Sequence, residues 1–228
     1  MMETVSRRLM MGAGVAVAAT PLLAGAPALA SQLVTVTYRD TSGADRAVAT
    51  PATERSLSRA AARVADADAD LTQIAQHARG AHGEVIDIAG TVTGPDGRTP
   101  VANATVEILQ ACALGDPSGL GAATGPADPN FQYYARLRTD RRGRFLFRTV
   151  RPGVIGARAP FVQLEISTGG RTLVTQMFFE GEARNASDPV LQAIADRRSR
   201  QRAVARAVSG IGPGEPAMFY HHIVLDTI

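Results

Sequence analysis

The chain has 228 residues, of which 45% are hydrophobic and 20% are charged. This composition excludes a disordered tail, a collagen and a mini-protein, because it supplies enough apolar side chains for one sizeable core. All 24 basic residues are arginine, and with 21 acidic residues they give a net charge of +3, too small to indicate a nucleic-acid-binding protein. The length fits one domain, or one domain with an appendage.

Residues 1–30 have the pattern of an export signal. A basic start with the paired Arg7 and Arg8 precedes an apolar stretch from Gly12 to Leu29, which ends in small residues around Ala30. Paired arginines are typical of the twin-arginine route, although an ordinary secretory signal also begins with basic residues. Two prolines interrupt the stretch, which disfavours an uncleaved membrane anchor. We therefore expect an exported protein, periplasmic or extracellular, with no membrane contact after the signal is removed.

Residues 31–82 are expected to form an N-terminal extension with one long helix. Leu33–Tyr38 alternates enough to be a short strand. Thr50 and Pro51 then make a good N-cap and first-turn pair, and Gly80 can end the helix. Apolar residues recur between them at helical spacing, namely Leu57, Ala60, Ala61, Val64, Leu71, Ile74 and Ala75. Because this stripe is poor in large side chains, we expect the helix to lie against the body or another subunit.

Residues 83–228 change to short β-type runs separated by turns such as Pro95–Gly97 and Gly169-Gly170. This spacing predicts an all-β fold, an antiparallel β-sandwich. A second helix is expected from Asp188-Pro189 into an arginine-rich stretch before the last strand. The expected strands are Val85–Thr93, Thr105–Gln110, Tyr133–Thr139, Arg144–Thr149, Phe161–Ser167, Thr172–Phe179 and Phe219–Leu225.

A series of separate motifs follows through this body in a fixed order. They are Ile88–Val92, Asp96–Arg98, Pro100–Ala104, Val106–Gln110, Asp128–Phe131, Arg136, Thr139-Asp140, Gly143, Phe147–Gly153, Ala159-Pro160 and Thr175–Gly181. Together they resemble the intradiol ring-cleavage dioxygenase family, of the protocatechuate 3,4-dioxygenase and catechol dioxygenase type. The resemblance implies that family's β-sandwich for residues 83–228, and aromatic compound metabolism as the setting.

The resemblance also implies where the family's metal site should lie. The family binds ferric iron through two tyrosines and two histidines, and the histidines alternate on one strand. The histidine positions correspond to Phe161 and Gln163 here, and the tyrosine positions to Pro117 and Ile155. Residues 111–132 contain no tyrosine at all. Phenylalanine, isoleucine and proline side chains offer no lone pair, and a neutral glutamine carbonyl is a poor lone ligand, so we expect no metal and no other cofactor.

Histidines elsewhere do not replace this set. His77, His82, His221 and His222 are the complete supply. His221 and His222 are adjacent on an expected strand and should point to opposite faces, so one of them at most enters a given site. We expect surface or packing roles for them rather than metal binding.

Polar residues around the family's substrate pocket are retained. Arg158 matches the arginine just before the histidine strand, and Gln176 matches a glutamine that lines the pocket in iron-bearing relatives. Gln163 and Glu165 share a face with Phe161 by strand alternation. These residues are predicted to bind a small aromatic ligand or carboxylate, because a guanidinium fork fits planar acids. The alternative is that Arg158 and Glu165 merely pair with each other.

Arginines cluster between residues 136 and 151. Strand alternation spreads them over exposed faces, so we interpret the cluster as a solvated rim or a subunit contact rather than a surface for nucleic acid.

Three functions remain open. The first, which the sequence favours, is an iron-free, non-catalytic subunit (a pseudoenzyme) in a homo- or hetero-oligomer with an intradiol-type subunit; one of the two subunit types of the protocatechuate enzymes lacks the iron ligands in the same way. The second is a metal-independent enzyme in which Glu165 accepts a proton and Arg158 holds an anionic oxygen. The third is a ring-cleaving dioxygenase with an unconventional ferric iron site.

Overall fold

The chain divides into two units, residues 1–45 and residues 46–228. Within the first unit, β1 (Val15–Ala19) and β2 (Val34–Tyr38) form an antiparallel pair, and β2 lies where a short strand was expected. None of the helices in the described part of the chain is long and apolar enough to cross a membrane. The computed structural model describes residues 15–19, 34–38, 47–57, 67–115, 127–208 and 212–226.

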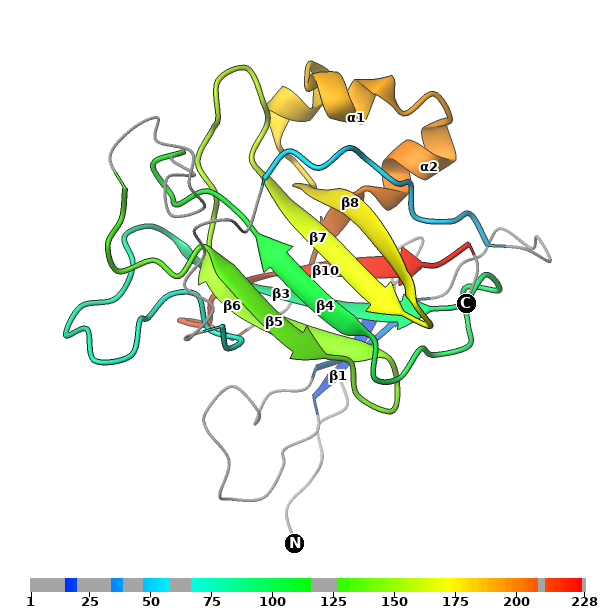
Figure 1. Cartoon of the computed structure of the whole chain (residues 1–228), viewed down its shortest axis with the longest axis horizontal. Helices are drawn as coiled ribbons and strands as arrows, with labels where there is room; N and C mark the ends of the chain where they lie inside the picture. Colours follow the sequence, from blue (N-terminus) through cyan, green and yellow to red (C-terminus); the bar gives the residue numbers. More distant parts are fainter. Residues whose placement is uncertain are drawn as a thin grey trace, which may run out of the picture. The chain divides into compact units, whose positions relative to one another are not determined.

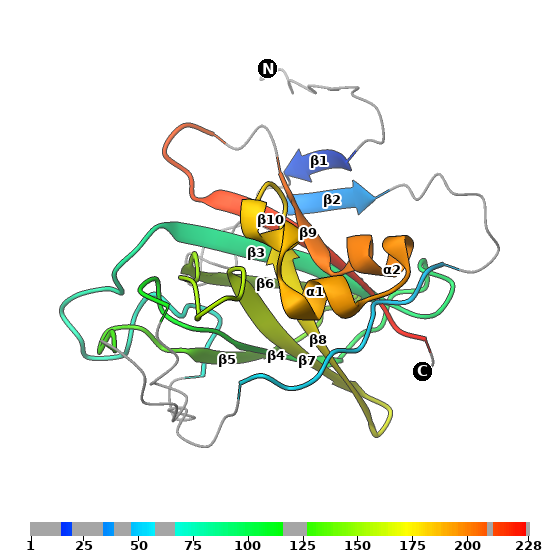
Figure 2. The ribbon, with the colours of Figure 1, turned by 90° about the horizontal axis from the view of Figure 1, so that it is seen from above.

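The second unit is built on one eight-stranded sheet with the order β5-β4-β7-β8-β9-β10-β3-β6. The outer strands β5 and β6 contact each other, so the sheet is nearly closed. Figures 1 and 2 show β4, β5, β7 and β8 lying as one layer across β3 and β10. The strands are β3 (Val85–Thr93), β4 (Thr105–Leu109), β5 (Tyr134–Arg138), β6 (Arg144–Val150), β7 (Phe161–Thr168), β8 (Arg171–Phe179), β9 (Val204–Ala207) and β10 (Ala217–Val224).

The expectation of a purely antiparallel sandwich was wrong, because the sheet is mixed. β10 runs parallel to β3 along its whole length, and β9 pairs parallel with β8 and antiparallel with β10. β9 was not expected at all, since its sequence Val-Ala-Arg-Ala continues an arginine-rich stretch of high helix propensity. It becomes a strand because both of its neighbours offer ladder partners, and it joins the two halves of the sheet.

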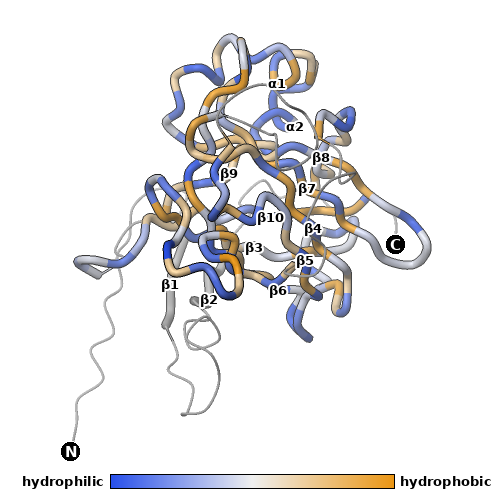
Figure 3. The backbone as a smooth tube through the Cα atoms, turned by 60° about the vertical axis from the view of Figure 1, so that its left-hand side comes forward, coloured by the Kyte–Doolittle hydropathy of each residue, from blue (hydrophilic) through white to orange (hydrophobic). Residues whose placement is uncertain are grey.

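β7 shows how the alternation of residues forms the core. Val162, Leu164 and Ile166 face one way and pack into the apolar core between the layers. Gln163 and Glu165 face the other way, and the alternation of hydrophobic and hydrophilic residues is visible along β7 in Figure 3. Both of these polar side chains are nevertheless buried, so another part of the chain covers this outer face.

The cover is an extended segment, residues 50–57, which we call the strap. Its backbone N–H at Thr50 donates to Val224 O and its N–H at Thr53 donates to Val174 O, both at 2.9 Å. Figure 1 shows this segment, in cyan, crossing in front of β8 and β7. The strap thus runs from β10 across β8 to β7.

The long helix expected to begin at Thr50-Pro51 was therefore wrong over residues 51–57, and also over residues 67–80, which form bends and turns. Residues 58–66 lie outside the described residues. Between 67 and 80 the backbone bonds to a strand and to its own aspartates: Leu71 N donates to Arg148 O, and Asp68 and Asp70 accept from N–H groups two residues on. Such local aspartate turns compete with a helix.

The second helix begins where it was expected but is divided in two. The Asp188 side chain caps α1 (Pro189–Ala193), and the Asp196 side chain caps α2 (Arg197–Arg202). A 3-10 turn, η4 (Ala183–Ala186), precedes them. The extra aspartate between the two short helices accepts an N–H bond of its own and restarts the helix.

Gly90 allows β3 to lie close to its sheet neighbours β6 and β10, and its substitution tests the packing of these three strands. A Cβ at this position would overlap the Phe145 ring and the carbonyl oxygen of His221. We expect Gly90→Ala to lower the free energy of unfolding by about 1–3 kcal/mol, because the backbone oxygen has no room to move. Urea unfolding measures this change. Gly212→Ala is the control, since its Cβ would lie 3.7 Å from a flexible Glu215 side chain; an equal loss in both variants would contradict the explanation.

Candidate functional site

The four side chains predicted to form a binding pocket lie together on the outer face of β7 and β8. Gln163 stands opposite Gln176 in the strand register, and Glu165 follows Gln163 on the same face. Arg158 precedes β7 and bonds to the Gln176 side chain. The structure thus brings these residues together, and their polar atoms contact the strap and nearby loops.

Gln163 is completely engaged by the strap and by its neighbour on β7. Its Oε1 accepts from the backbone N–H groups of Ser56 at 2.9 Å and Leu57 at 2.8 Å. Its Nε2 donates to Leu57 O at 2.9 Å and to Glu165 Oε1 at 3.0 Å. A carboxamide has two acceptor lone pairs and two donor hydrogens, so all four are used.

Glu165 pairs with Arg55 of the strap and not with Arg158. Nε and Nη2 of Arg55 donate to the two carboxylate oxygens at 2.9 and 2.8 Å. The Glu165 side chain is 4% exposed and that of Arg55 is 52% exposed, so the pair lies at the edge of the buried face. The hydrogen bond and the charge of Glu165 raise the pKa of Arg55 above its usual value. Arg55 gave no signal in the sequence, because it was placed in a helix.

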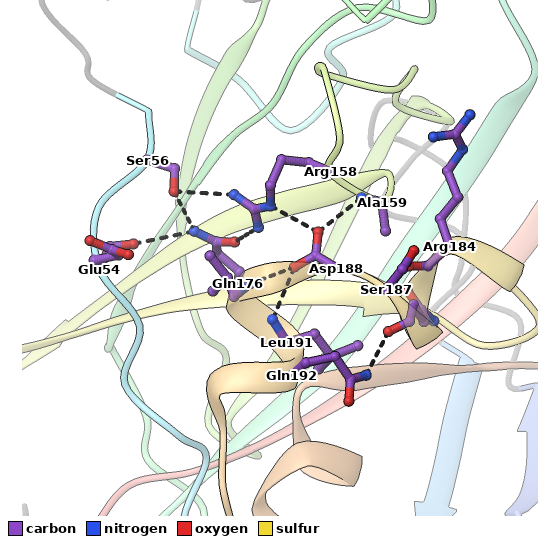
Figure 4. A network of polar contacts seen from close by, with 12 residues as sticks. Glu54, Ser56, Arg158, Ala159, Gln176, Arg184, Ser187, Asp188, Leu191 and Gln192 are labelled. Carbon is purple, nitrogen blue, oxygen red and sulfur yellow. Dashed lines mark hydrogen bonds and ion pairs between the residues drawn. The ribbon is translucent and has the colours of Figure 1, made fainter.

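Arg158 is held by a second carboxylate, Asp188, as Figure 4 shows. Its Nε donates to Asp188 Oδ2 at 2.8 Å, and Nη2 donates to the Gln176 side chain. Its guanidinium carbon lies 4.4 Å from the centre of the Phe161 ring, a cation–π distance. Gln176 in turn donates to the Ser56 hydroxyl at 2.7 Å.

Asp188 supports this network and α1 at the same time. Oδ1 accepts from the N–H groups of Val190 and Leu191, and Oδ2 accepts from Ala159 N as well as from Arg158. Burial pushes the pKa of Asp188 upward, but the bonds from Arg158 and from the backbone outweigh it and hold the pKa below its usual value. The sequence indicated Asp188 only as a helix start; its link to Arg158 was missed.

The described positions that correspond to the family's iron ligands do not fit a ferric ion. Phe161 is buried, the Arg158 guanidinium lies over its ring, and the centre of the Phe178 ring is 6.3 Å from its own. Ile155 packs against the apolar core, and neither side chain has a lone pair. Gln163 has no acceptor left. Pro117 lies outside the described residues.

No other metal centre replaces it in the described part of the chain, where no group of three or more histidine, cysteine, aspartate or glutamate side chains is placed to hold a metal ion. His222 bonds to Thr93 at 2.9 Å, and His77 contacts Asn130 at the surface. His221 points into the core, and its Nε2 has no hydrogen-bond partner. Burial, with a smaller effect of the neighbouring His222 and Arg202, lowers the pKa of His221 to about 3.

Comparison with known sequences gives consistent matches. The sequence model of the family described as Dioxygenase matches residues 58–166. The chain is 34% identical over 149 residues to the protocatechuate 3,4-dioxygenase beta chain of Burkholderia cepacia, covering 61% of this chain and 63% of that relative. It is 33% identical over 156 residues to the alpha chain from the same organism, covering 65% of this chain and 74% of the relative. The match thus spans less than two thirds of the beta chain.

Solved structures share the fold. An intradiol ring-cleavage dioxygenase from Tetranychus urticae aligns with a TM-score of 0.60 and 14% identity, over 78% of this chain and 94% of that one. The dioxygenase domain of a carbohydrate-binding fusion protein from Streptomyces sp. SirexAA-E aligns with a TM-score of 0.57 and 22% identity, over 79% of this chain and all of that one. The mixed, nearly closed sheet is therefore the one these dioxygenases use.

Removal of the Asp188 carboxylate should destabilise the chain strongly. Asp188→Ala leaves Arg158 without its carboxylate and three backbone N–H groups without their acceptor, so we expect a loss of about 3 kcal/mol in the free energy of unfolding. Urea unfolding at neutral pH measures it. Asp196→Ala is the matched control, because Asp196 also caps a short helix but lies exposed. A loss at Asp188 no larger than at Asp196 would contradict the role of the buried network.

His221 should make the protein less stable in acid. The His221 side chain takes up a proton near pH 6.5 in the unfolded chain but only near pH 3 in the folded chain. Between these values the unfolded chain therefore binds more protons, and the free energy of unfolding falls as the pH falls. The contribution of His221 to this slope is about 1.4 kcal/mol per pH unit. His221→Leu should remove that contribution and give a shallower dependence in urea unfolding at a series of pH values. His77→Ala, at an exposed histidine, should keep the wild-type slope; equal slopes in wild type and His221→Leu would refute the assignment.

Proposed function

Since the chain belongs to the intradiol ring-cleavage dioxygenase family, we propose that it is an iron-free, non-catalytic member that serves as a subunit beside an iron-bearing homologue. The observation that carries the proposal is the state of Gln163, at a histidine position of the family. Both of its acceptor lone pairs receive N–H groups of the strap. A ferric ion there would have to displace the strap and would gain only a neutral carbonyl oxygen.

The remaining ligand positions support the same conclusion. Phe161 and Ile155 have no donor atoms, and residues 111–132 contain no tyrosine that would supply the first phenolate. Ferric iron prefers phenolate oxygen, imidazole nitrogen and carboxylate ligands. With three of the four positions apolar and the fourth a satisfied amide, binding at the family's site has no source of affinity.

The proposed partner follows from the relatives. Two relatives of this chain are the alpha and beta chains of protocatechuate 3,4-dioxygenase, so this enzyme has two related chain types. A chain that keeps the fold without the ligands suits a supporting place in such a hetero-oligomer, with a homo-oligomer as the simpler form. The basic, apolar pattern of residues 1–30 favours export of this subunit to the periplasm or the exterior.

Acid–base catalysis by Glu165 is less well supported. A general base must reach the proton that it removes with a free lone pair. Here both carboxylate oxygens accept from Arg55, one also accepts from Gln163, and the side chain is 4% exposed. The strap would have to leave before a substrate met this carboxylate.

Metal analysis of the purified mature chain tests the proposal. We expect no stoichiometric iron, before or after incubation with ferric iron, and no oxygen uptake with catechol or protocatechuate. One iron per chain with a phenolate-to-iron absorption band would overturn the proposal, as would oxygen uptake that chelation abolishes.

Co-expression with an iron-bearing intradiol homologue tests the subunit role, and that homologue is the positive control for the iron and oxygen measurements. We expect the two chains to co-purify at a fixed ratio. If this chain stays alone when it is co-expressed with each iron-bearing intradiol homologue of its own organism, the subunit role is contradicted, whereas the absence of iron is not.

A further inference from the structure

The strap is bound to the sheet as an extended peptide is bound to a recognition site. Three hydrogen bonds from β8 hold backbone atoms of the strap. Thr53 N donates to Val174 O at 2.9 Å, Thr175 Oγ1 donates to Pro51 O at 2.8 Å, and Gln176 Nε2 donates to Glu54 O at 3.2 Å. Residues 50–57 belong to no helix or strand, and Figure 1 shows them drawn out along the sheet. The contacts therefore depend on an extended backbone.

The Gln163 side chain binds the backbone of Leu57, at the end of the strap, as a neighbouring strand would. Its carboxamide accepts from the N–H of Leu57 and donates to the carbonyl of Leu57. This pair of bonds imitates a backbone amide in a ladder, and a side chain makes it from within the sheet. Leu57 is 7% exposed and belongs to the apolar core, so it anchors the end of the bound segment.

The face also selects one side chain. Arg55 offers the two donors that Glu165 accepts side by side, a geometry that lysine does not reproduce. Ser56 adds a hydroxyl that accepts from Gln176 at 2.7 Å. The preferred sequence is thus an arginine followed by a small hydroxyl residue and an apolar anchor.

These contacts come from five consecutive residues, 53–57, together with Pro51, and most of the polar atoms on the face have their partners there. If the strap left, Gln163 would lose three of its four bonds and Glu165 would lose its counter-charge, both in a largely buried position. Any group that replaced the strap would have to supply an extended amide backbone and a guanidinium. A small planar acid supplies neither, and its charge would oppose that of Glu165.

We propose that the face of β7 and β8 bearing Gln163, Glu165 and Gln176 is a peptide-binding site for an extended, arginine-containing segment, which this chain fills with its own residues 53–57 and which also accepts that segment from a second copy of the chain. The site recognises local atoms only, so the segment fits whichever copy supplies it. The chain's own strap competes with such a segment, at an effective concentration in the millimolar range. The inference goes beyond the proposed function and does not depend on the absence of iron.

Binding of a synthetic peptide tests the site. The probe is a fluorescent peptide of residues 50–57, measured by anisotropy against full-length chains. Arg55→Ala loosens the own strap and leaves the face intact, so we expect this chain to bind the probe at least tenfold more tightly than the wild type. A probe with alanine in place of the arginine should bind at least tenfold more weakly.

Matched variants control the measurement. Arg98→Ala, at an exposed arginine of the turn after β3, should bind the probe no better than the wild type. If circular dichroism shows that Arg55→Ala is unfolded, Ser56→Pro takes its place, because it removes the N–H that donates to Gln163. Equal binding of the arginine and alanine probes, or no binding to any folded loosened chain, would overturn the proposal.

Mixing two variants tests the second copy. Glu165→Ala keeps the strap and damages the face, whereas Arg55→Ala keeps the face and damages the strap. We expect a heterodimer in native mass spectrometry when these two variants are mixed. We expect no heterodimer when Arg55→Ala is mixed with the variant that carries both Arg55→Ala and Glu165→Ala, because neither chain then has an intact strap. Probe binding without a heterodimer would refute exchange between copies and confine the site to the chain's own strap.

Discussion

A buried carboxamide governs this structure. Gln163 lies on the outer face of β7 with no exposed surface, and an unpaired amide in such a place would cost about 1–3 kcal/mol. Its four bonding sites are filled by backbone atoms of Ser56 and Leu57 and by Glu165. The amide therefore requires an extended segment above the sheet, and the position of the strap follows from that requirement.

Charges on the same face are arranged around this constraint. Two buried carboxylates, Glu165 and Asp188, each hold a guanidinium, from Arg55 and Arg158 respectively. Removing one partner of such a pair leaves an uncompensated charge, which is why buried pairs resist change. A relative with this fold is an intradiol ring-cleavage dioxygenase. In this chain, the face of β7 and β8 binds backbone amides and guanidinium groups. The polar residues that the resemblance predicts to line a binding pocket hold residues 54–57 of this chain.

Prediction from the sequence succeeded where a short-range pattern decides the structure. The strand period of two placed Gln163 and Glu165 on one face, and the start of α1 at Asp188 followed from capping chemistry. The prediction of a helix over residues 51–57 and 67–80 was wrong. The apolar residues do recur at helical spacing, but distant groups on the sheet offer the backbone better hydrogen bonds. β9 was not predicted for a similar reason, because the strand is formed by pairing with β8 and β10 and not by a local pattern.

The sequence by itself determined seven of the eight strands of the sheet, which side chains share a face of β7, and which atoms at Phe161, Ile155 and Gln163 are available to a metal, because each of these depends on residue chemistry and local periodicity. Only the tertiary structure decided what lies above that face. The partner of Glu165 is 110 positions away and that of Gln163 is 106 positions away. No local pattern encodes a bond of that range; it arises when the packed sheet presents unsatisfied polar atoms and the strap is the part of the chain that reaches them.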